Sequence, residues 1–356
     1  MNSISINSNW KIGYFLAALS IMITVLCTAF AQTSSLSGWT LDFVVNDNLP
    51  PGFRQFKTSR KDGTMQTAFI VDINNCLAKR KPLMIFVDGS GAHSHFFVTP
   101  TGRRGTGVYG AIAMLPADEY HVIASDKRGV EFGYAGSNPG ADVGAPAEYS
   151  RFATVEGRIS EVRLLLDRML REPMVDSSRV LLLGHSEGAD VAAGAAAEDP
   201  RITHVAFLAG GGPTQMFDGM VSRRKEMIKN GRSPDQIENS IQELEENYRK
   251  IFADLDNETK ILDGHSYRYW ASFFSHPPME SILKTKAKLF LAHGTEDRAV
   301  PVESFDMLVV ELIRHGCTNA TIRRYPGRDH GLGYPGDRNS PPLGGVLEDV
   351  LEWARK

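Results

Sequence analysis

The stretch VLLLGHSEGADVAAGA (residues 180–195) decides the fold. Its first four residues form an apolar run typical of a buried strand, and its last eight are mostly small residues that suit a closely packed helix. Between them, residues 184–188 read G-x-S-x-G. Glycine at both flanks suits a turn too tight for side chains, and such a turn lifts Ser186 out at the end of the strand. This context predicts a nucleophile elbow, with an ordinary β-to-α turn and a solvated serine as the alternative.

Apolar runs and periodic segments extend this pattern along the chain. Further strands are predicted at residues 82–87, 120–125, 202–209, 287–292 and 321–325, a hairpin at 53–59 and 65–71, and helices at 152–169 and 343–356. Strands that are solid apolar runs alternate with helices. That alternation predicts an α/β fold, in which a mostly parallel sheet is covered by helices on both faces.

The alternation is interrupted at residues 215–284, which we interpret as a helical lid inserted into the core. Ser233 and Pro234 provide a helix start, and apolar residues then recur at steps of three and four. The aromatic residues that follow suit either packing of the lid on the core or the lining of a pocket. We assign four of them to a substrate pocket: Tyr267, Tyr269, Trp270 and Phe273. The expected organisation is a core of residues 32–214 and 285–356, split by the lid.

The first 31 residues are expected to be a signal peptide rather than part of the fold. Lys11 precedes an uncharged run at residues 12–31, which ends Ala29-Phe30-Ala31, an A-x-A type of cleavage site. This predicts export to the periplasm or the medium, with an uncleaved membrane anchor as the alternative. Export would permit a disulfide between Cys76 and Cys317, although two separate thiols fit the sequence as well.

The composition limits which classes of binding partner we expect. The chain has 356 residues, of which 42% are hydrophobic, and a net charge of −3 from 39 basic and 42 acidic residues. The sequence has no basic stripe, so we do not expect nucleic acid as a partner. The expected partner is a small-molecule acyl substrate. Once the signal is cleaved, we expect no stable insertion into a membrane. The sequence does not indicate an oligomeric state.

Two further strand ends provide the groups that a serine nucleophile needs. A serine hydroxyl is a poor nucleophile at neutral pH until a base takes its proton and an acid orients that base. The run at residues 289–292 continues into HGTEDR, and the run at 321–325 continues into PGRDHG. A serine, an acidic residue and a histidine therefore follow three strands in that order, at the sheet edge where ligands of open α/β sheets bind.

These motifs resemble those of the α/β-hydrolase superfamily, over about residues 65–355 apart from the lid. The resemblance implies Ser186 as nucleophile, Asp297 as acid and His330 as base, with Glu296 the alternative acid. It also implies a structural role for the D-x-R-G turn at residues 126–129. One oxyanion donor would be the N–H of Glu187, and the other would come from Ser90 or Gly91. The family often carries His-Gly-Gly in that loop, and this chain has Asp88 in place of the histidine.

The implied chemistry is acyl transfer to water without a cofactor. The resemblance extends towards exported esterases and towards prolyl-oligopeptidase-like peptidases, which carry a large N-terminal domain that we do not expect here. We therefore expect cleavage of a carboxylic ester or thioester, with a peptidase as the alternative, in which lid glutamates such as Glu238 would bind a substrate amine. Two weaker alternatives are a non-catalytic binding protein and a metal site at His93 and His95, and we predict no metal.

Overall fold

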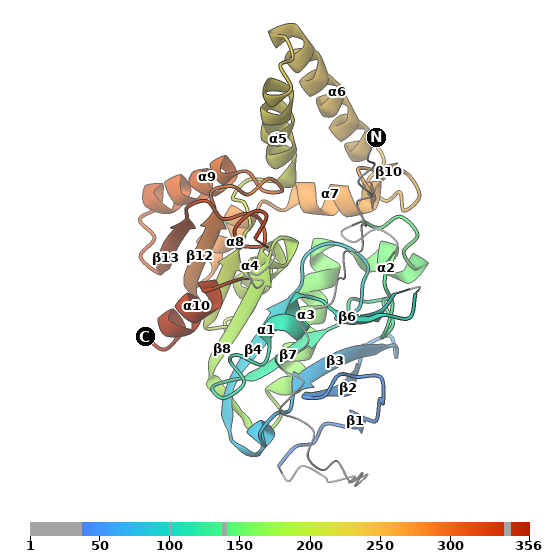
Figure 1. The fold of residues 1–356 in the computed structure, drawn as a ribbon, viewed down its shortest axis with the longest axis vertical. Helices are drawn as coiled ribbons and strands as arrows, with labels where there is room; N and C mark the ends of the chain where they lie inside the picture. Colours follow the sequence, from blue (N-terminus) through green and yellow to red (C-terminus); the bar gives the residue numbers. More distant parts are fainter. Residues whose placement is uncertain (1–37, 100, 137–140, 338–342) are drawn as a thin grey trace, which may run out of the picture. The chain divides into compact units, whose positions relative to one another are not determined.

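The computed structural model describes residues 38–99, 101–136, 141–337 and 343–356. The predicted signal peptide lies outside these residues. A nine-stranded sheet runs through the described part in the order β1-β2-β3-β7-β4-β8-β9-β12-β13 (Figure 1). Its strands are β1 (Phe43–Val44), β2 (Phe53–Ser59), β3 (Met65–Val71), β4 (Lys81–Val87), β7 (His121–Ser125), β8 (Val175–His185), β9 (His204–Leu208), β12 (Lys288–Gly294) and β13 (Ala320–Tyr325).

The six strands from β7 to β13 run parallel, and the first three strands are joined to them antiparallel. The mostly parallel sheet confirms the predicted α/β class. Central strands are buried on both faces, as the solid apolar runs indicated: Leu181, Leu182 and Leu183 are all fully buried. The predicted hairpin forms as β2 and β3, paired from Phe53 opposite Val71 to Ser59 opposite Met65.

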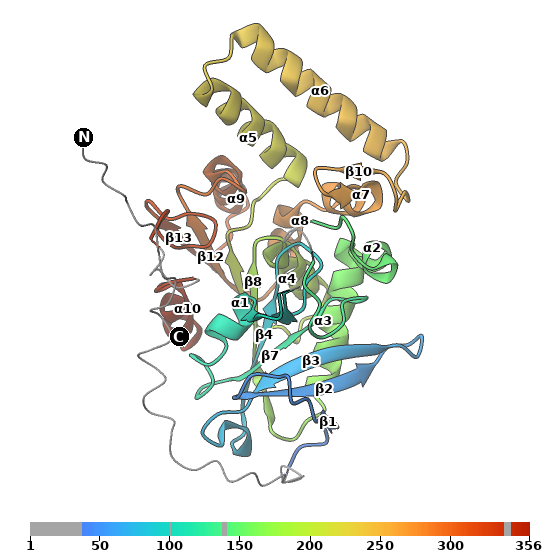
Figure 2. The ribbon, with the colours of Figure 1, turned by 45° about the vertical axis from the view of Figure 1, so that its right-hand side comes forward.

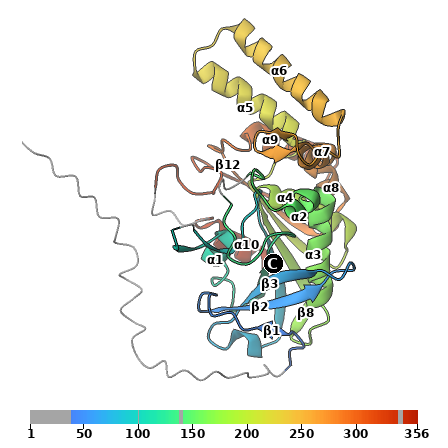
Figure 3. The same ribbon diagram turned by 90° about the vertical axis from the view of Figure 1, so that its right-hand side faces the viewer.

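Helices cover both faces of the sheet. On one face α1 and α10 pack on alternate residues of the central strands, including Met84, Phe86 and Leu183. On the other face lie α3 and α4 (Figure 3). The described helices are α1 (Val108–Ile112), α2 (Ala147–Phe152), α3 (Val155–Met169), α4 (Glu187–Glu198), α5 (Gln215–Lys229), α6 (Pro234–Phe252), α7 (Tyr267–Ser275), α8 (Pro278–Lys284), α9 (Val302–Arg314) and α10 (Val346–Ala354), with a 3-10 turn at Cys76–Ala78.

The helix predicted at residues 152–169 is two helices. Phe152 ends α2, and α3 starts afresh at Val155 because the side chain of Thr154 accepts a hydrogen bond of 3.1 Å from the N–H of Gly157. This N-cap satisfies a backbone donor that a continuous helix would have bonded differently. The break matters for the site because it sets the residue at which α3 begins.

The inserted segment consists of helices with their own small apolar cluster. Helix α6 begins with the predicted Ser233 cap and Pro234, and the Gln236 side chain completes a capping box. Its apolar face packs on α5 and α7 through a cluster that includes Ile251 and Phe274. Helices α5 and α6 extend away from the sheet (Figure 2). Helix α5, which the sequence pattern did not indicate, and the short strands β10 (Ile261–Leu262) and β11 (His265–Ser266) complete the insertion with α7 and α8.

Two further features concern the thiols and the membrane. Cys76 and Cys317 are both free, so the disulfide that export would permit does not form and the two-thiol alternative holds. Among the described helices, none combines the length and the apolar character that a membrane crossing requires.

Candidate active site

Ser186 stands in a strained turn between β8 and α4. Its backbone φ of 57° and ψ of −132° are values that a residue with a side chain rarely adopts. The flanking glycines make this turn possible. A Cβ on Gly184 would collide with the backbone of Gly188, and one on Gly188 would collide with the carbonyl oxygens of Val87 and Asp88. This is the geometry of a nucleophile elbow.

His330 and Asp297 complete a hydrogen-bonded chain with this serine. The Nε2 atom of His330 lies 2.9 Å from the Oγ of Ser186, and its Nδ1 atom lies 2.8 Å from the Oδ2 of Asp297. The other carboxylate oxygen of Asp297 accepts hydrogen bonds from the N–H groups of Ala299 (2.8 Å) and Val300 (2.9 Å). Asp297 is buried, so these donors fix its orientation and compensate its charge. The three side chains lie within reach of direct proton transfer.

Glu296, the alternative acid, and Asp329, the neighbour of His330, both point elsewhere. Glu296 is exposed, and no hydrogen bond of its side chain is found among the described residues. Asp329 closes its own turn by accepting hydrogen bonds from the N–H groups of Gly331 (3.0 Å) and Gly333 (3.3 Å). Of Glu296, Asp297 and Asp329, Asp297 is the one that contacts the ring of His330.

Two other histidines support the site without entering it. The Nε2 of His185 donates a hydrogen bond of 2.8 Å to the carbonyl oxygen of His330, and burial lowers the pKa of His185 to about 4. His293 stacks on Phe305 with ring centroids 5.0 Å apart and contacts the carbonyl of Val300, and burial lowers its pKa too. Both rings are therefore neutral at neutral pH and shape the loops that carry the acid and the base.

The proposed oxyanion donors lie beside the serine. Glu187 and Ser90 both line the catalytic pocket, and no partner for either N–H is found within the described residues. Gly89 brings the loop close, because a Cβ placed there would lie 3.3 Å from the Cβ of Ser186. Gly91 is outside the pocket lining, and its carbonyl accepts a hydrogen bond of 2.6 Å from Lys127. Ser90 is thus the better placed of the two loop candidates.

The pocket itself has a volume of about 280 Å³, which suits a small acyl group. Of the four aromatic residues assigned to it, Tyr269 and Trp270 line it. Tyr267 and Phe273 do not, because they occupy other faces of α7: Tyr267 packs against the α6–α7 cluster, and Phe273 is buried beside Tyr269 with ring centroids 4.7 Å apart. Two of the four assigned aromatic residues therefore line the pocket, and the other two pack elsewhere in the protein.

Two acidic side chains in the pocket wall were not predicted from the sequence. Asp190 lies one helical turn after Ser186 on α4, and Asp218 lies on α5. Burial raises the pKa of Asp190 well above its ordinary value and that of Asp218 to about 7. One oxygen of each carboxyl lacks a hydrogen-bond partner in the described part of the chain. The four-residue step from Ser186 to Asp190 was a usable signal, whereas nothing in the sequence placed α5 here.

The lid glutamates proposed for an amine lie on α6 outside the pocket lining; Glu238 is exposed and Glu245 half-buried. Glu238 pairs with Arg224, and Glu245 pairs with Arg249 at 3.1 Å. They form a solvated helix face, and no contact with the substrate pocket supports the amine-binding role.

The weaker metal alternative also lacks a ligand set. His93 contacts Asp88 at 2.9 Å, and His95 faces the carbonyl of Ser125 at 3.1 Å. No group of three metal-ligating side chains gathers anywhere in the described ranges. Asp126, in the D-x-R-G turn, binds the hydroxyl of Ser94 and the N–H of His95, each at 2.8 Å, which is a structural role.

Comparisons with known proteins agree with this geometry. A model of the prolyl oligopeptidase family matches residues 156–355, more than half of the chain. No curated protein matches. Among solved structures, acetyl xylan esterase 1 from Thermoanaerobacterium sp. JW/SL YS485 has 13% identity and a TM-score of 0.51, and the match covers 89% of this chain and 87% of that one.

Two other solved structures give a similar result. Acylaminoacyl peptidase from Pyrococcus horikoshii has 15% identity and a TM-score of 0.53, over 84% of this chain and 41% of that one. Est1E from Butyrivibrio proteoclasticus with ferulic acid bound has 18% identity and a TM-score of 0.51, over 83% and 95%. At these identities the likeness shows the fold, and the family model spans Ser186, Asp297 and His330. The chain belongs to the prolyl oligopeptidase family and is a serine hydrolase of the α/β-hydrolase fold.

Proposed function

We propose that the protein is an exported carboxylic ester hydrolase that works through an acyl-enzyme on Ser186. The observation that carries this proposal is the continuous chain of contacts from the Oγ of Ser186 through His330 to Asp297, at 2.9 and 2.8 Å. An ester or thioester is the least demanding substrate for such a site, because its leaving group is better than the amine of a peptide.

The first half-reaction forms the acyl-enzyme. The Oγ of Ser186 attacks the carbonyl carbon while its proton passes to the Nε2 of His330. Asp297 accepts the hydrogen bond from Nδ1 and stabilises the charged imidazole. The N–H groups of Glu187 and Ser90 would bind the oxyanion of the tetrahedral intermediate. His330 then gives the proton to the leaving oxygen, and the bond between the carbonyl carbon and that oxygen breaks.

The second half-reaction releases the acid. Water attacks the acyl carbonyl as its proton passes to the Nε2 of His330, and the same donors bind the second oxyanion. The proton returns to the Oγ of Ser186 as the bond between that oxygen and the acyl carbon breaks. The pocket of about 280 Å³ beside Ser186 favours a short or compact acyl group.

A peptidase that accepts a substrate with an amine is the second candidate, and the pocket carboxyls favour it. Asp190 and Asp218 each keep an oxygen without a partner in the described part of the chain, and an ammonium group could donate to both. Esterases and peptidases both occur among the structural neighbours, so the fold does not choose between them.

A panel of p-nitrophenyl esters of graded chain length, run beside aminoacyl nitroanilides on the purified mature protein, separates these candidates. The proposal predicts hydrolysis of the short esters, with a rate that falls as the acyl chain grows, and far slower cleavage of the anilides. Faster turnover of the anilides than of the matched esters would favour the peptidase, and no turnover of either would contradict both.

Export rests on the uncharged run at residues 12–31 and the A-x-A end at residues 29–31. The proposed cleavage gives a mature protein that begins at Gln32. Mass spectrometry of the N-terminus, recovered from the periplasm or the medium, tests this. An intact N-terminus in the membrane fraction would favour the uncleaved anchor instead.

A further inference from the structure

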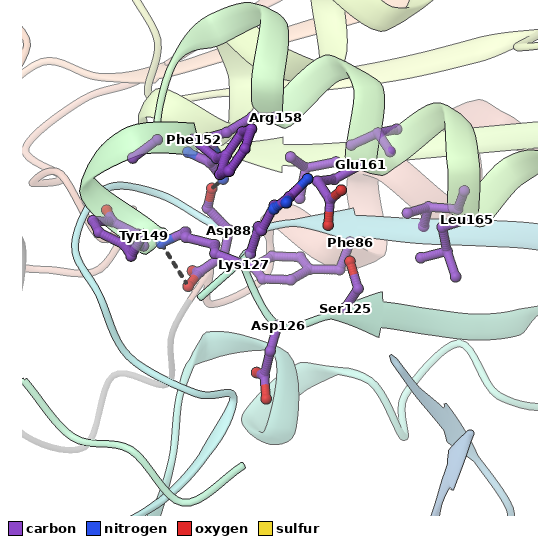
Figure 4. A pocket seen from close by; sticks show the side chains of 15 residues that line it. Phe86, Asp88, Ser125, Asp126, Lys127, Tyr149, Phe152, Arg158, Glu161 and Leu165 are labelled. Carbon is purple, nitrogen blue, oxygen red and sulfur yellow. Dashed lines mark hydrogen bonds and ion pairs between the residues drawn. The ribbon is translucent and has the colours of Figure 1, made fainter. Parts of the chain in front are cut away.

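Three charged side chains are buried beneath the loop that follows β4. Asp88, Lys127 and Arg158 have side-chain exposures of only 12%, 8% and 8%. They line a cavity of about 40 Å³, in which Lys127 and Arg158 both lie beside Asp88 (Figure 4). A space of this size has room for a few waters at most and is too small for a substrate. Since burying charge is costly, we asked what these groups do for the neighbouring site.

Arg158 contacts both halves of the oxyanion site. From α3, its guanidinium donates a hydrogen bond to the carbonyl oxygen of Asp88, makes a longer contact of 3.4 Å with that of Gly89, and pairs with the carboxylate of Glu187. Glu187 also accepts a hydrogen bond from the hydroxyl of Tyr269 on α7. A planar guanidinium with five donors suits such a bridge, and the flexible ammonium of a lysine does not.

Because of the geometry of the peptide unit, these contacts also orient the N–H groups that are the proposed oxyanion donors. In a trans peptide the C=O and N–H groups point in opposite directions. Because Arg158 contacts the carbonyl of Gly89, at 3.4 Å, the N–H of Ser90 in the same peptide unit points away from Arg158, and Ser90 lines the catalytic pocket. On the other side, Arg158 fixes the first residue of α4, Glu187, whose N–H is the second proposed donor.

Lys127 secures the far end of the same loop. Its Nζ atom donates a hydrogen bond of 2.6 Å to the carbonyl of Gly91 and lies 3.6 Å from the carboxylate of Asp88. That carboxylate also contacts His93 at 2.9 Å. Although burial opposes it, the charge of Lys127 and the hydrogen bond from His93 hold the pKa of Asp88 well below its usual range. Asp88, where related enzymes often carry histidine, is therefore the anion that keeps Lys127 under the loop.

We propose that Arg158 is the positioning residue of the oxyanion hole: its guanidinium holds the Asp88–Gly89 carbonyls and Glu187 together, so that the N–H groups of Ser90 and Glu187 converge on one oxygen, and Lys127 supports the end of the loop. This proposal rests on acyl transfer at Ser186. Arg158 does not touch the substrate, and it acts through the two backbone donors.

The test compares the deletion of two ion pairs, each of which has one partner on α3. Removing one partner of a buried pair leaves an unpaired charge, so both partners are neutralised in the double variant R158M/E187Q. The matched control is R60M/E161Q, which removes the largely buried pair between Arg60, after β2, and Glu161, on the next turn of α3. Glu161 lines the same cavity, but its carboxylate pairs with Arg60, and within the described ranges it is not bonded to the loop after β4 or to Glu187. Kinetics use a short p-nitrophenyl ester. Oxyanion binding is measured with a trifluoromethyl ketone, which forms a tetrahedral oxyanion on the serine.

We expect kcat of R158M/E187Q to fall by about 10- to 100-fold, less than the loss of a whole oxyanion donor, with KM within about threefold of wild type. Affinity for the ketone should fall by the same factor as kcat/KM. The control R60M/E161Q should keep wild-type kcat. The double variant D88N/K127M, in which the Arg158–Glu187 pair is intact and neither buried charge is left alone, should lose kcat and ketone affinity in parallel by a smaller factor, which gives a second reading if R158M/E187Q folds poorly.

Unchanged kcat and ketone affinity in R158M/E187Q would overturn the proposal. So would an equal loss in R60M/E161Q at an equal melting temperature, because activity would then follow stability rather than the oxyanion site. If the ketone fails to inhibit the wild type and hydrolysis persists in Ser186→Ala, the proposed function itself is wrong. A loss confined to the Arg158 and Lys127 variants, with the wild type inhibited, supports both proposals.

Discussion

The rim of the sheet, where the parallel strands end, and the inserted helices differ in how their side chains are held in place. At the rim, Ser186, Asp297 and His330 each follow the end of a parallel strand, and the strand pairing itself brings them together. The insertion has an apolar cluster of its own and forms part of the pocket beside Ser186, where Tyr269 contacts Glu187. The strand ends therefore carry the three groups of the candidate triad, while the insertion provides walls of the pocket beside them.

The largest effect expected at the rim is the loss of the nucleophile. Ser186→Ala removes the attacking oxygen while the fold stays intact, and we expect kcat to fall by about 10⁶-fold. Ester hydrolysis with a coupled thermal melt is the measurement. A loss below about tenfold would show that the acyl group is transferred elsewhere, and the contrast between rim and insertion would then fail.

The acid gives the next largest effect. Asp297→Asn keeps the shape but loses the charge that orients His330, and we expect about a 10⁴-fold loss of kcat. Glu296→Gln is the neighbouring control, and because Glu296 is exposed we expect its kcat within about twofold of wild type. If the two variants lost activity in reverse order, the assignment of the acid would have to move to Glu296.

A substitution in the apolar cluster of the insertion tests whether this region unfolds separately from the rim. Ile251 is fully buried in the α5–α7 cluster, and Ile251→Ala should cost about 2–5 kcal/mol there. We expect faster hydrogen exchange and proteolysis in α5 and α6, with the exchange of β8 unchanged. Leu182→Ala, in the main core, should instead loosen both regions. Equal exchange everywhere in Ile251→Ala would mean that rim and insertion unfold as one unit.

The smallest effect concerns the dependence of stability on pH at Asp218. Burial raises its pKa to about 7 from the ordinary 3.8. The folded chain therefore holds a proton that the unfolded chain has released, and this group's contribution to the free energy of unfolding falls as the pH rises from about 4 to 7. Asparagine does not ionise, so the free energy of unfolding of Asp218→Asn relative to wild type should rise across this window and then level off.

Urea denaturation of both proteins at several pH values between 4 and 8 measures that difference. Contributions from groups distant from Asp218 cancel in it, whereas Asp190, whose pKa is raised by burial and by the charge of Asp218, adds to it. A difference that stays constant would show that Asp218 ionises alike in the folded and unfolded chains. The pocket wall would then carry a permanent charge, which would strengthen the case for a cationic substrate.

The two regions also differ in how far the sequence predicted them. Ser186 and His330 could be located because glycine-flanked turns after apolar strands leave a local pattern. No such pattern indicated the roles of Arg158 and Lys127. The carbonyl and carboxylate groups that surround a buried cation come from other parts of the chain and meet it only in the folded structure. The aromatic residues of α7 were assigned to the pocket as a group, although the helix turns Tyr269 towards the site and Phe273 into the core.

Ser186 as the acyl acceptor is the claim on which the mechanism depends, and covalent labelling tests it most directly. The mature wild-type protein is treated with a fluorophosphonate, digested and mapped by mass spectrometry beside Ser186→Ala. The account predicts one adduct per chain, on the peptide that carries Ser186, and no adduct in the variant. An adduct on another residue, or labelling that survives in Ser186→Ala, would contradict it.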